Sequence, residues 1–268
     1  MIFILDFEQF LKENSICYKR NDTLFFFPDK NIIIQLVPLK NWNSILEVFD
    51  LKSNYASVNK RKIFLYEDRW YGNAETTKKR ILAHLGIFTS VFARNCDLKE
   101  IESVRASDFL KKYHSYGTAG SKYKLGLFYK DKLIAVSTFS QSRPMKRIID
   151  GQEKFLQSYE WVRYASLPEL RISGGMGKLL KAFVDKYQPE EVMSYADKEW
   201  SDGDVYGKLG FTCLGEREPV KFLVNIHTFQ RFSEKKLLQD RAYRSVNVIE
   251  EGYFQIWNMG SIKYLKQF

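Results

Sequence analysis

The chain lacks several features that would place it in a well-defined class of protein. It has only three cysteines in 268 residues, Cys17, Cys96 and Cys213, which are widely spaced and odd in number. Neither a disulfide framework nor a zinc site is therefore expected, and a reducing cytosol is the expected compartment. No apolar run reaches the roughly 18 residues of a membrane-spanning helix. The N-terminal segment "MIFILDFEQFLKEN" has neither the basic stretch nor the small-residue cleavage site of a signal peptide.

The composition predicts a folded, basic protein. Apolar residues make up 45% of the chain and aromatic residues 16%, which argues against disorder. The formal net charge is +10 and the pI about 9.3, which favours a polyanionic partner such as nucleic acid, or an anionic cofactor. The alternative is a solubilising surface, since 32 acidic residues are also present. The basic clusters are dispersed along the chain, so folding would have to assemble any basic patch.

The first 88 residues read as a small α/β unit. A helix is predicted around Asp6–Glu13, and β-branched and aromatic runs predict buried strands. The segment that follows the second of these strands has helical spacing. A third strand is predicted to run into acidic residues, and a helix to begin after Asn73 and to end at Gly86. The predicted strands span residues 23–28, 31–37 and 62–70, and the predicted helices residues 41–50 and 73–86.

Residues 89–225 read as a second, larger unit with a mixed sheet. Its clearest element is a hairpin over residues 123–140, in which two apolar strands flank the polar tip Lys130-Asp131-Lys132. A basic C-terminal extension, residues 226–268, is expected to pack on the core and to hold a helix over residues 231–243. A strand and a connecting hairpin are predicted over residues 90–104, single strands over residues 154–166 and 190–197, and two closing strands over residues 212–224. The predicted helices span residues 107–117, 174–187 and 202–211.

A glycine-rich turn lies between a strand and a helix in "LPELRISGGMGKLL". The first amides of a helix have no partners inside the helix and lie at the positive end of its dipole, which favours phosphate. Gly174 and Gly175 allow a close approach of the backbone because they have no Cβ atom. The turn therefore predicts an anion site, although glycines also begin helices for purely structural reasons. The candidate residues are Arg171, Ile172, Ser173, Gly174, Gly175, Met176 and Gly177.

This turn resembles the arginine/glutamine-x-x-glycine-x-glycine/alanine loop of the GCN5-related acetyltransferase (GNAT) superfamily, with Met176 where a small residue is usual. The segment "VYGKLGF" resembles that superfamily's later tyrosine-bearing helix. The resemblance implies an acetyltransferase-like fold with splayed strands beside the loop, and pyrophosphate of acetyl-CoA or a related acyl-CoA bound there. It also implies that Tyr206 protonates the departing thiolate, a role that suits a phenol with an ordinary pKa near 10. The alternative is that Tyr206 merely packs on Phe211.

A narrower resemblance covers about residues 20–268. The segments "YEWVRY" and "SYADKEWSDGDVYGKLGF" are similar to Mom-type phage DNA-modification proteins. Together with "YEDRW", "FARNCDLKEI", "FLKKYHSYG" and "GYFQIWNMGSIKY", they are still more similar to the C-terminal region of phage Vsr-like homing endonucleases. The resemblance implies a phage-related protein that associates with DNA, and an acetyltransferase-like cleft that contains Glu160, Arg163, Asp197 and Tyr206.

Those four residues are the catalytic candidates. Asp197 ends its predicted strand, where a carboxylate can accept a proton or orient an amine. Arg163 is suited to hold a phosphate or a carboxylate. Strict strand alternation puts Glu160 and Arg163 on opposite faces, so a β-bulge is needed to bring them together. The alternative is that Glu160 and Arg163 are structural ion-pair partners on neighbouring strands.

Further residues are candidates for contact with nucleic acid. His114 is either a base or a helix-end residue, and the aromatic residues Trp161, Trp200 and Tyr195 either stack on a base or belong to the core. The candidates for this contact are His114, Lys122, Lys124, Arg143 and Trp200.

The first unit resembles a nuclease that has lost its metal site. The nuclease pattern requires an aspartate and a glutamate as metal ligands, because Mg²⁺ binds negatively charged oxygen ligands. Leu24 and Gln35 stand at those positions, so no metal is expected and the unit is predicted not to cut DNA. The acids that remain, Glu67 and Asp68, are interpreted as charges at a helix entrance.

The sequence predicts an α/β (α+β) fold with a degenerate restriction-endonuclease-like unit before an acetyltransferase-like domain. Three functions stay open. The first is a DNA-associated acyltransferase that transfers an acyl group from an acyl-CoA donor to an amine. A nucleobase is one candidate for the molecule that carries this amine. The second is a DNA-binding protein without catalysis, and the third is an N-acetyltransferase of small molecules.

Overall fold

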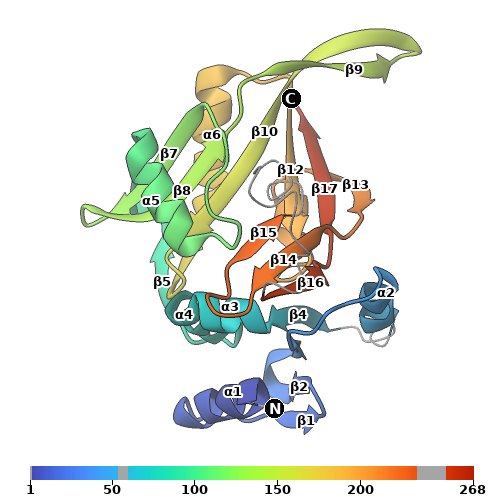
Figure 1. Ribbon diagram of the computed structural model, residues 1–268. Coiled ribbons are helices and arrows are strands. Elements are labelled where there is room, and N and C mark those ends of the chain that lie inside the picture. Colours follow the sequence, from blue (N-terminus) through green and yellow to red (C-terminus); the bar gives the residue numbers. More distant parts are fainter. Residues whose placement is uncertain (1, 54–59, 234–251) are drawn as a thin grey trace. The chain divides into compact units, whose positions relative to one another are not determined.

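The computed structural model describes residues 2–53, 60–233 and 252–268 (Figure 1). The chain forms two compact units that do not follow the predicted boundaries at residues 88 and 225. The first unit comprises Met1–Thr77, Ala196–Gly203 and Glu216–Ile262, and the second Lys78–Tyr195, Asp204–Gly215 and Lys263–Phe268. Most of the predicted C-terminal extension thus belongs to the first unit. No helix in the described parts of the chain is long and apolar enough to cross a membrane.

The first unit contains a four-stranded sheet of order β1-β2-β3-β4. β2 and β3 form an antiparallel hairpin, whereas β3 and β4 are parallel. Every residue of β3 is buried, which explains why "IIIQLV" reads as an almost unbroken apolar run. The strands are β1 (Lys19–Asn21), β2 (Leu24–Phe27), β3 (Ile32–Val37) and β4 (Arg61–Tyr66), and a 3-10 turn, η1 (Pro28–Lys30), joins β2 to β3.

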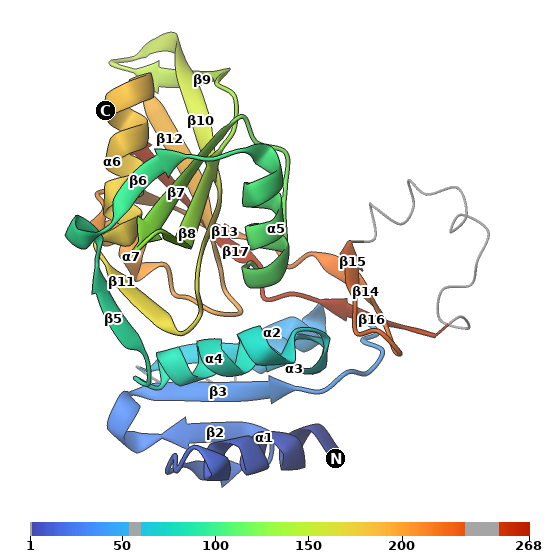
Figure 2. The same ribbon diagram turned by 90° about the vertical axis from the view of Figure 1, so that its left-hand side faces the viewer.

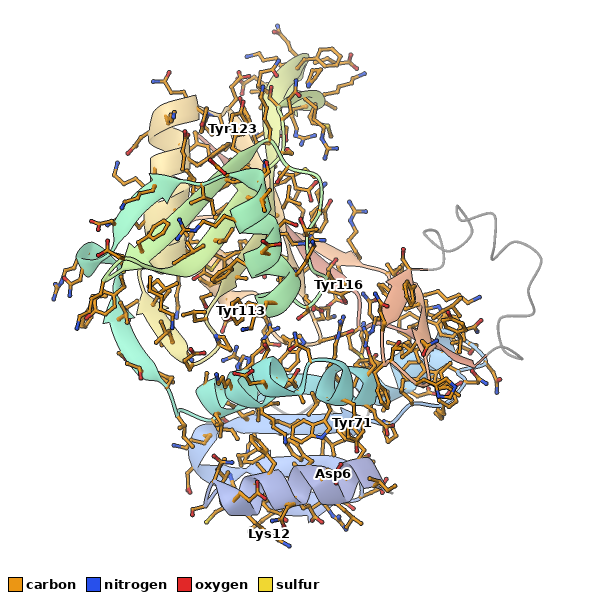
Figure 3. All side chains as sticks on the ribbon, turned by 60° about the vertical axis from the view of Figure 1, so that its left-hand side comes forward. Asp6, Lys12, Tyr71, Tyr113, Tyr116 and Tyr123 are labelled. Atoms are coloured by element: carbon orange, nitrogen blue, oxygen red, sulfur yellow. The ribbon has the colours of Figure 1, made fainter. Side chains whose placement is uncertain are left out.

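The predicted N-terminal helix is present as α1 (Ile2–Glu13) and begins earlier than the sequence indicated. Its buried side chains recur every three or four residues, so one face of the helix is apolar. Phe7 contacts the indole of Trp70 edge-on, at 5.4 Å between ring centroids. Beside this contact the Tyr71 hydroxyl donates to the Asp6 carboxylate at 2.6 Å (Figure 3).

The other helices of this unit differ from the prediction at their ends. The helix predicted over residues 41–50 begins only at Leu46, and the strand predicted over residues 62–70 stops at Tyr66 because Glu67 begins a helix. The helices are α2 (Leu46–Ser53), α3 (Glu67–Gly72) and α4 (Ala74–His84), and α4 continues into the second unit.

A three-stranded sheet, β15-β14-β16, also belongs to the first unit. The sequence assigned residues 212–224 to two closing strands of the larger unit, but β14 pairs with β15 and β16 instead. Arg231–Ser233, the start of the predicted basic helix, form a strand, and the rest of that helix lies outside the described residues. The strands are β14 (Lys221–Asn225), β15 (Arg231–Ser233) and β16 (Tyr253–Trp257).

A buried ionic network joins three distant segments of the first unit. The Arg231 guanidinium donates to both carboxylate oxygens of Asp68, each at 2.8 Å, and to Glu199 at 2.6 Å. The side chains of these three residues are at most 3% exposed. The ring of Tyr66 lies 4.7 Å from the guanidinium. Asp68 lies in the first turn of α3, as its interpretation as a helix-entry charge requires, and it is also one end of a desolvated ion pair.

Removing one partner of this network is predicted to destabilise the first unit. Asp68→Asn leaves the Arg231 charge buried and poorly compensated, so the expected cost is about 3 to 5 kcal/mol. Hydrogen exchange of the β4 amides measures the local stability. Arg20→Met is the control, since it breaks an ion pair with Glu8 whose arginine is 39% exposed, and it should cost less than about 1 kcal/mol. Equal effects of the two variants would contradict a special role of the network.

The second unit is built on a mixed sheet of order β13-β17-β12-β10-β8-β7-β6, with β9 paired to β10 alone. β10 is antiparallel to β8 and parallel to β12. This arrangement confirms the predicted α/β class with a mixed sheet. The strands are β6 (Asp97–Glu100), β7 (Tyr123–Tyr129), β8 (Lys132–Phe139), β9 (Arg143–Ile149), β10 (Gln152–Ser166), β12 (Glu191–Asp197), β13 (Thr212–Arg217) and β17 (Ser261–Gln267).

The predicted hairpin is confirmed as β7 and β8. Lys130 and Asp131 at its tip both have positive φ, 48° and 61°, a backbone twist that suits a two-residue hairpin. A separate parallel pair joins β5 to β11. These strands are β5 (Thr89–Phe92) and β11 (Leu170–Ser173), and a 3-10 turn, η2 (Ala93–Asn95), follows β5.

Helices cover both faces of the central strands. α5 and α6 lie on opposite sides of β7, β8 and β10 (Figure 2). On the α6 side, the ring of Phe183 stacks on Phe139 with 3.8 Å between centroids. The helices are α5 (Ser103–Tyr113), α6 (Gly175–Tyr187) and α7 (Asp204–Lys208); α5 begins before the predicted Ser107, with Glu102 as its N-cap residue.

Candidate functional site

Two parallel strands of the second unit separate partway along their length. β10 and β12 pair only through three successive positions, the last of which sets Glu160 opposite Met193. β10 then continues to Ser166 and β12 to Asp197 without further pairing between these fully described strands. Backbone groups that face the gap therefore lack the ladder partners that a parallel sheet supplies. Such unpaired strand edges can form hydrogen bonds with the amide groups of a ligand.

A serine bridges the strands at the point where they separate. Ser194 follows the last paired residue of β12, and its hydroxyl donates to the carbonyl of Trp161, the next residue of β10, at 3.0 Å. Ser194 is 2% exposed. A side chain thus replaces the backbone hydrogen bond that the separating strands no longer make.

The tyrosine predicted as a catalytic acid lies at this bridge. The Tyr206 hydroxyl oxygen is 2.8 Å from the hydroxyl oxygen of Ser194. Either hydroxyl can be the donor in this contact, and the phenol also donates to the carbonyl of Tyr195 at 3.5 Å. The ring of Tyr206 stacks on Tyr264 of β17 at 4.7 Å, and the Trp161 indole lies edge-on to it at 6.2 Å. The packing on Phe211, offered as the alternative reading, is also present, at 5.5 Å.

Burial determines the protonation state of Tyr206. The side chain is 8% exposed, and desolvation raises the pKa of its phenol above the ordinary value, with a further rise from Tyr264. The hydrogen bond with Ser194 lowers the same pKa and so opposes the effect of burial. The phenol keeps its proton at neutral pH and is suited to be a proton donor rather than a base.

Removal of the Ser194 hydroxyl is predicted to raise the pKa of Tyr206 further, because the hydrogen bond that favours the phenolate is lost. Alkaline absorbance titration measures this when each protein is compared with its own Tyr206→Phe derivative. Ser137→Ala is the matched control: Ser137 is buried in the same sheet, and its hydroxyl has no partner among the described residues. An unchanged titration in Ser194→Ala, or an equal shift in Ser137→Ala, would refute the assignment.

The predicted anion site is the entrance to α6. Gly174 precedes the helix with φ +77°, a conformation that favours glycine, and the space where its Cβ would stand is open except for Ala93 at 3.7 Å. Gly175 has a packing role, because a Cβ there would lie 2.8 Å from Ile172. A Cβ on Gly177 would lie 3.3 Å from Leu209, just after α7. The backbone at Gly174 is therefore uncrowded where it enters α6.

The cations beside this helix entrance have different contacts. Arg171 is exposed, and its guanidinium lies 4.9 Å from the centre of the Phe88 ring. Lys178 is in the first turn of α6, but its ammonium donates to the carbonyl oxygens of Ala93 and Cys96. Lys178 therefore anchors the helix to η2, which leaves Arg171 as the exposed cation of the loop. Of the other loop residues, Ser173 is exposed and Ile172 and Met176 are half-buried.

The β-bulge required to bring Glu160 and Arg163 together is present. The pairing of β10 with β8 shifts by one residue between Trp161 and Arg163. The Glu160 carboxylate raises the pKa of Arg163, although burial is the larger influence and lowers that pKa overall. Arg163 donates to the carbonyl of Gly117 at 3.2 Å.

Glu160 also has a cation on the neighbouring strand. Its carboxylate is 3.8 Å from the Arg143 guanidinium, so the ion-pair reading of Glu160 applies with Arg143 as the partner. The Glu160 side chain is 28% exposed and stays accessible to an incoming group.

Asp197 and Trp200 belong to the first unit. The Asp197 carboxylate accepts the amide hydrogen of Glu199 at 3.0 Å and so stabilises the turn after β12. Trp200 is only 2% exposed. The prediction that Trp200 contacts nucleic acid is corrected, since a core indole offers no face for a base. Trp161, also 2% exposed, is a core residue as well.

The remaining candidates make local contacts. His114 follows α5, and its Nδ1 accepts the amide hydrogen of Tyr116 at 3.1 Å. Tyr116 is labelled in Figure 3. The Lys122 ammonium lies over the ring of Tyr123 at 5.4 Å. Lys124 donates to the carbonyl of Ser121 at 2.8 Å. Lys122 is exposed and Lys124 is half-buried.

Electrostatic charge is distributed unequally between the units. The second unit carries 24 lysines and arginines against 13 aspartates and glutamates, a formal net charge of +11. The first unit carries 18 against 19, a net charge of −1. The whole excess of positive charge in the chain therefore lies in the second unit.

The positions of the expected nuclease acids lie side by side in the first unit. Leu24 and Gln35 face each other across the β2–β3 hairpin and are 6% and 4% exposed. The Gln35 carboxamide donates to the hydroxyl of Thr23 and to the carbonyl of Leu36. The described part of the chain holds no group of three or more histidine, cysteine or acidic side chains arranged for a metal ion. Loss of nuclease activity stays a prediction.

Comparison with known proteins gives structural neighbours but no family. No protein-family model and no curated protein sequence matches the chain. Similar solved structures include a Bacillus subtilis acetyltransferase in complex with CoA, at 15% identity over 65% of this chain and 99% of that one, with a TM-score of 0.37. An IAA acetyltransferase from Bacillus cereus has 13% identity with the same coverage and a TM-score of 0.39. The ribosomal-protein-S18-alanine N-acetyltransferase of Escherichia coli has 11% identity over 64% and 93%, with a TM-score of 0.36.

Sequence reasoning missed two residues that shape the site. Ser194 is part of "EVMSYAD", where a hydroxyl among apolar strand residues is the available signal. Tyr264 comes from the last strand, and nothing local in "SIKYLKQF" indicates that its ring stacks on Tyr206.

Proposed function

We propose that the second unit is an acyltransferase that uses an acyl-CoA donor and acylates an amine. The observation that carries the proposal is the separation of β10 and β12, with the protonated phenol of Tyr206 held by Ser194 at the start of the gap. A gap between parallel strands with an acid at its closed end suits an extended thioester, whose leaving group needs a proton. The likeness of the glycine turn and "VYGKLGF" to GNAT sequences supports the same conclusion.

In this proposal the donor is held mainly by backbone groups. The amides of the CoA arm pair with the unpaired edges of β10 and β12, and the pyrophosphate accepts hydrogen bonds from the first amides of α6. Arg171, the exposed cation of the loop, adds a favourable charge. Met176 is compatible because backbone amides, rather than the side chain at that position, contact the phosphate.

The reaction divides into two proton transfers. The amine attacks the thioester carbonyl, a C–N bond forms, and the C–S bond breaks to release the thiolate. Tyr206 gives its proton to the sulfur and regains one from solvent by way of Ser194. The amine loses one proton as it is acylated, and Glu160, accessible beside Arg143, is the proposed acceptor.

Acetyl-CoA is predicted to stabilise the protein. At one hundred times Kd, a ligand bound only to the native state raises apparent stability by about 2.7 kcal/mol. Ser173→Asp places a negative charge beside the phosphate site and should weaken binding about tenfold or more, a loss of about 1.4 kcal/mol. The control is Ser103→Asp, at the start of α5, which should bind normally. Thermal unfolding with and without acetyl-CoA checks this, and no shift in the native protein would refute donor binding.

The acceptor that we propose is an amine of a nucleobase. The support is the +11 charge of the unit that holds the site, together with the resemblance to phage DNA-modification proteins. A base inside a duplex is out of reach, so the acceptor must be single-stranded or flipped out. Tyr195, 37% exposed on β12, is the remaining aromatic candidate for stacking.

Binding of single-stranded DNA is predicted to depend strongly on salt, because released counterions drive phosphate contacts. The double variant Lys122→Gln/Lys124→Gln should weaken binding and flatten the slope of log K against log salt. The control is the double variant Lys19→Gln/Lys30→Gln in the first unit, which should leave the DNA affinity and the slope unchanged. Fluorescence anisotropy from 50 to 200 mM salt gives the slopes. DNA binding without acetyl-CoA binding would favour the non-catalytic alternative, and acetyl-CoA binding without DNA binding the small-molecule acetyltransferase.

A further inference from the structure

A cavity of about 710 Å³ opens in the first unit at the carboxyl ends of β3 and β4. These two strands are parallel, so the segments that follow them leave the same edge of the sheet. Residues 38–42 follow β3, and Glu67 follows β4 directly as the first residue of α3. Both segments line the cavity, and α2 supplies a third wall.

The position and size of this cavity are typical of a ligand site. In open α/β sheets, ligands bind outside the carboxyl ends of parallel strands, where loops leave a crevice. Cavities that take small molecules measure roughly 300 to 1,000 Å³ and are mostly apolar, with a few convergent polar groups.

The charged side chains of the lining already interact with other groups of the protein. The Lys40 ammonium is 2.8 Å from the Glu47 carboxylate. One carboxylate oxygen of Glu67 accepts the amide hydrogen of Leu39 at 2.7 Å, which ties the segment after β4 to the segment after β3. Asp50 is likewise engaged with the rest of the chain. Recognition of a ligand in this cavity therefore has to come from its other groups.

The other walls provide an apolar surface. Val37, Pro38 and Leu39 leave the end of β3, and Leu51 comes from α2. A ligand that covers these side chains removes apolar surface from water, which is favourable whatever polar group it carries.

One polar group of the lining lacks a partner. Trp42 is 2% exposed, and its indole N–H has no acceptor in the part of the chain that the structure describes. Its backbone, in contrast, is held on both sides: its amide donates to the carbonyl of Gln255 at 3.0 Å, and its carbonyl accepts from the Gln255 side chain at 3.1 Å. A buried donor without an acceptor is rare and costs free energy, so a missing occupant is the natural explanation.

We propose that this cavity binds a small neutral molecule with an apolar body and a carbonyl oxygen. The carbonyl accepts the indole hydrogen of Trp42, and the apolar body covers Val37, Pro38 and Leu51. An anion meets the carboxylate of Glu67, and an ammonium ion leaves the indole donor without an acceptor. The proposal does not depend on acyl transfer, because every residue in it belongs to the first unit.

The indole nitrogen is itself buried, so the ligand reaches it only when the ring turns toward the cavity. Binding therefore has a direct signature. The indole proton of Trp42 gains an acceptor, and its NMR resonance should move downfield when the ligand is added. Loss of one indole cross-peak in Trp42→Phe assigns that resonance among the five tryptophans of the chain.

The test uses three probes with the same alkyl chain length on the full chain: hexanamide, hexanoate and hexylammonium. Saturation-transfer NMR should show hexanamide binding at least about tenfold more tightly than either ion, because an ion must give up its water on entering an apolar cavity. Trp42→Phe keeps an aromatic ring but removes the donor, and should weaken hexanamide about fivefold, the effect of one hydrogen bond. Trp257→Phe, an indole of β16 outside the cavity, is the control and should change nothing.

A second variant tests the cavity apart from the donor. Leu51→Trp fills the apolar space, and it should weaken hexanamide while the indole resonance of Trp42 stays at its ligand-free position. Four results would each overturn the proposal: a Trp42 resonance that hexanamide does not move, an ion that binds as tightly as hexanamide, native affinity in Leu51→Trp, or no binding of hexanamide at tens of millimolar.

Discussion

The second unit depends on the separation of β10 and β12. Parallel strands that pair at Glu160 and Met193 and then diverge leave two rows of backbone polar groups without a ladder, and such groups must find other partners or water. One is met by Ser194, whose hydroxyl spans the first unpaired position. The bulge in β10 lies at the same level, between Trp161 and Arg163, and it redirects the strand just where pairing to β12 ends. The gap, the bulge and the serine bridge are thus parts of one local solution to a backbone problem.

The same geometry explains the character of Tyr206. α7 carries the phenol to the bridge, where Tyr264, Trp161 and Phe211 surround the ring and exclude water. An ionised phenol in such surroundings is costly, so the proton is retained. Ser194 moderates that cost by offering a hydrogen bond. A proton donor of this kind has to be kept neutral and yet able to lose its proton. Burial provides the first condition and the serine hydroxyl the second.

The sequence predicted those features that short segments determine. The hairpin of β7 and β8 follows from two apolar runs about a polar tip, and the glycine entrance of α6 from a conformation that favours glycine. Even the need for a bulge followed from the alternation of Glu160 and Arg163. Features that join distant segments were missed. Arg231 pairs with Glu199 and with Asp68, which is 163 residues away in the sequence. No local pattern distinguishes a buried arginine from an exposed one. The predicted boundaries at residues 88 and 225 follow chain order, whereas the first unit takes in Ala196–Gly203 and Glu216–Ile262, which are distant in sequence from its start.

The carboxyl ends of β3 and β4 form a crevice because both strands point the same way, whatever side chains follow them. Leu24 and Gln35, which face each other on the hairpin, supply no charge for a metal ion. Glu67 and Asp50 line this crevice among apolar side chains. Topology therefore fixes where a ligand can bind, and the side chains decide its class. With +11 on the second unit and −1 on the first, only the second unit has the net charge that favours the polyanionic partner proposed above.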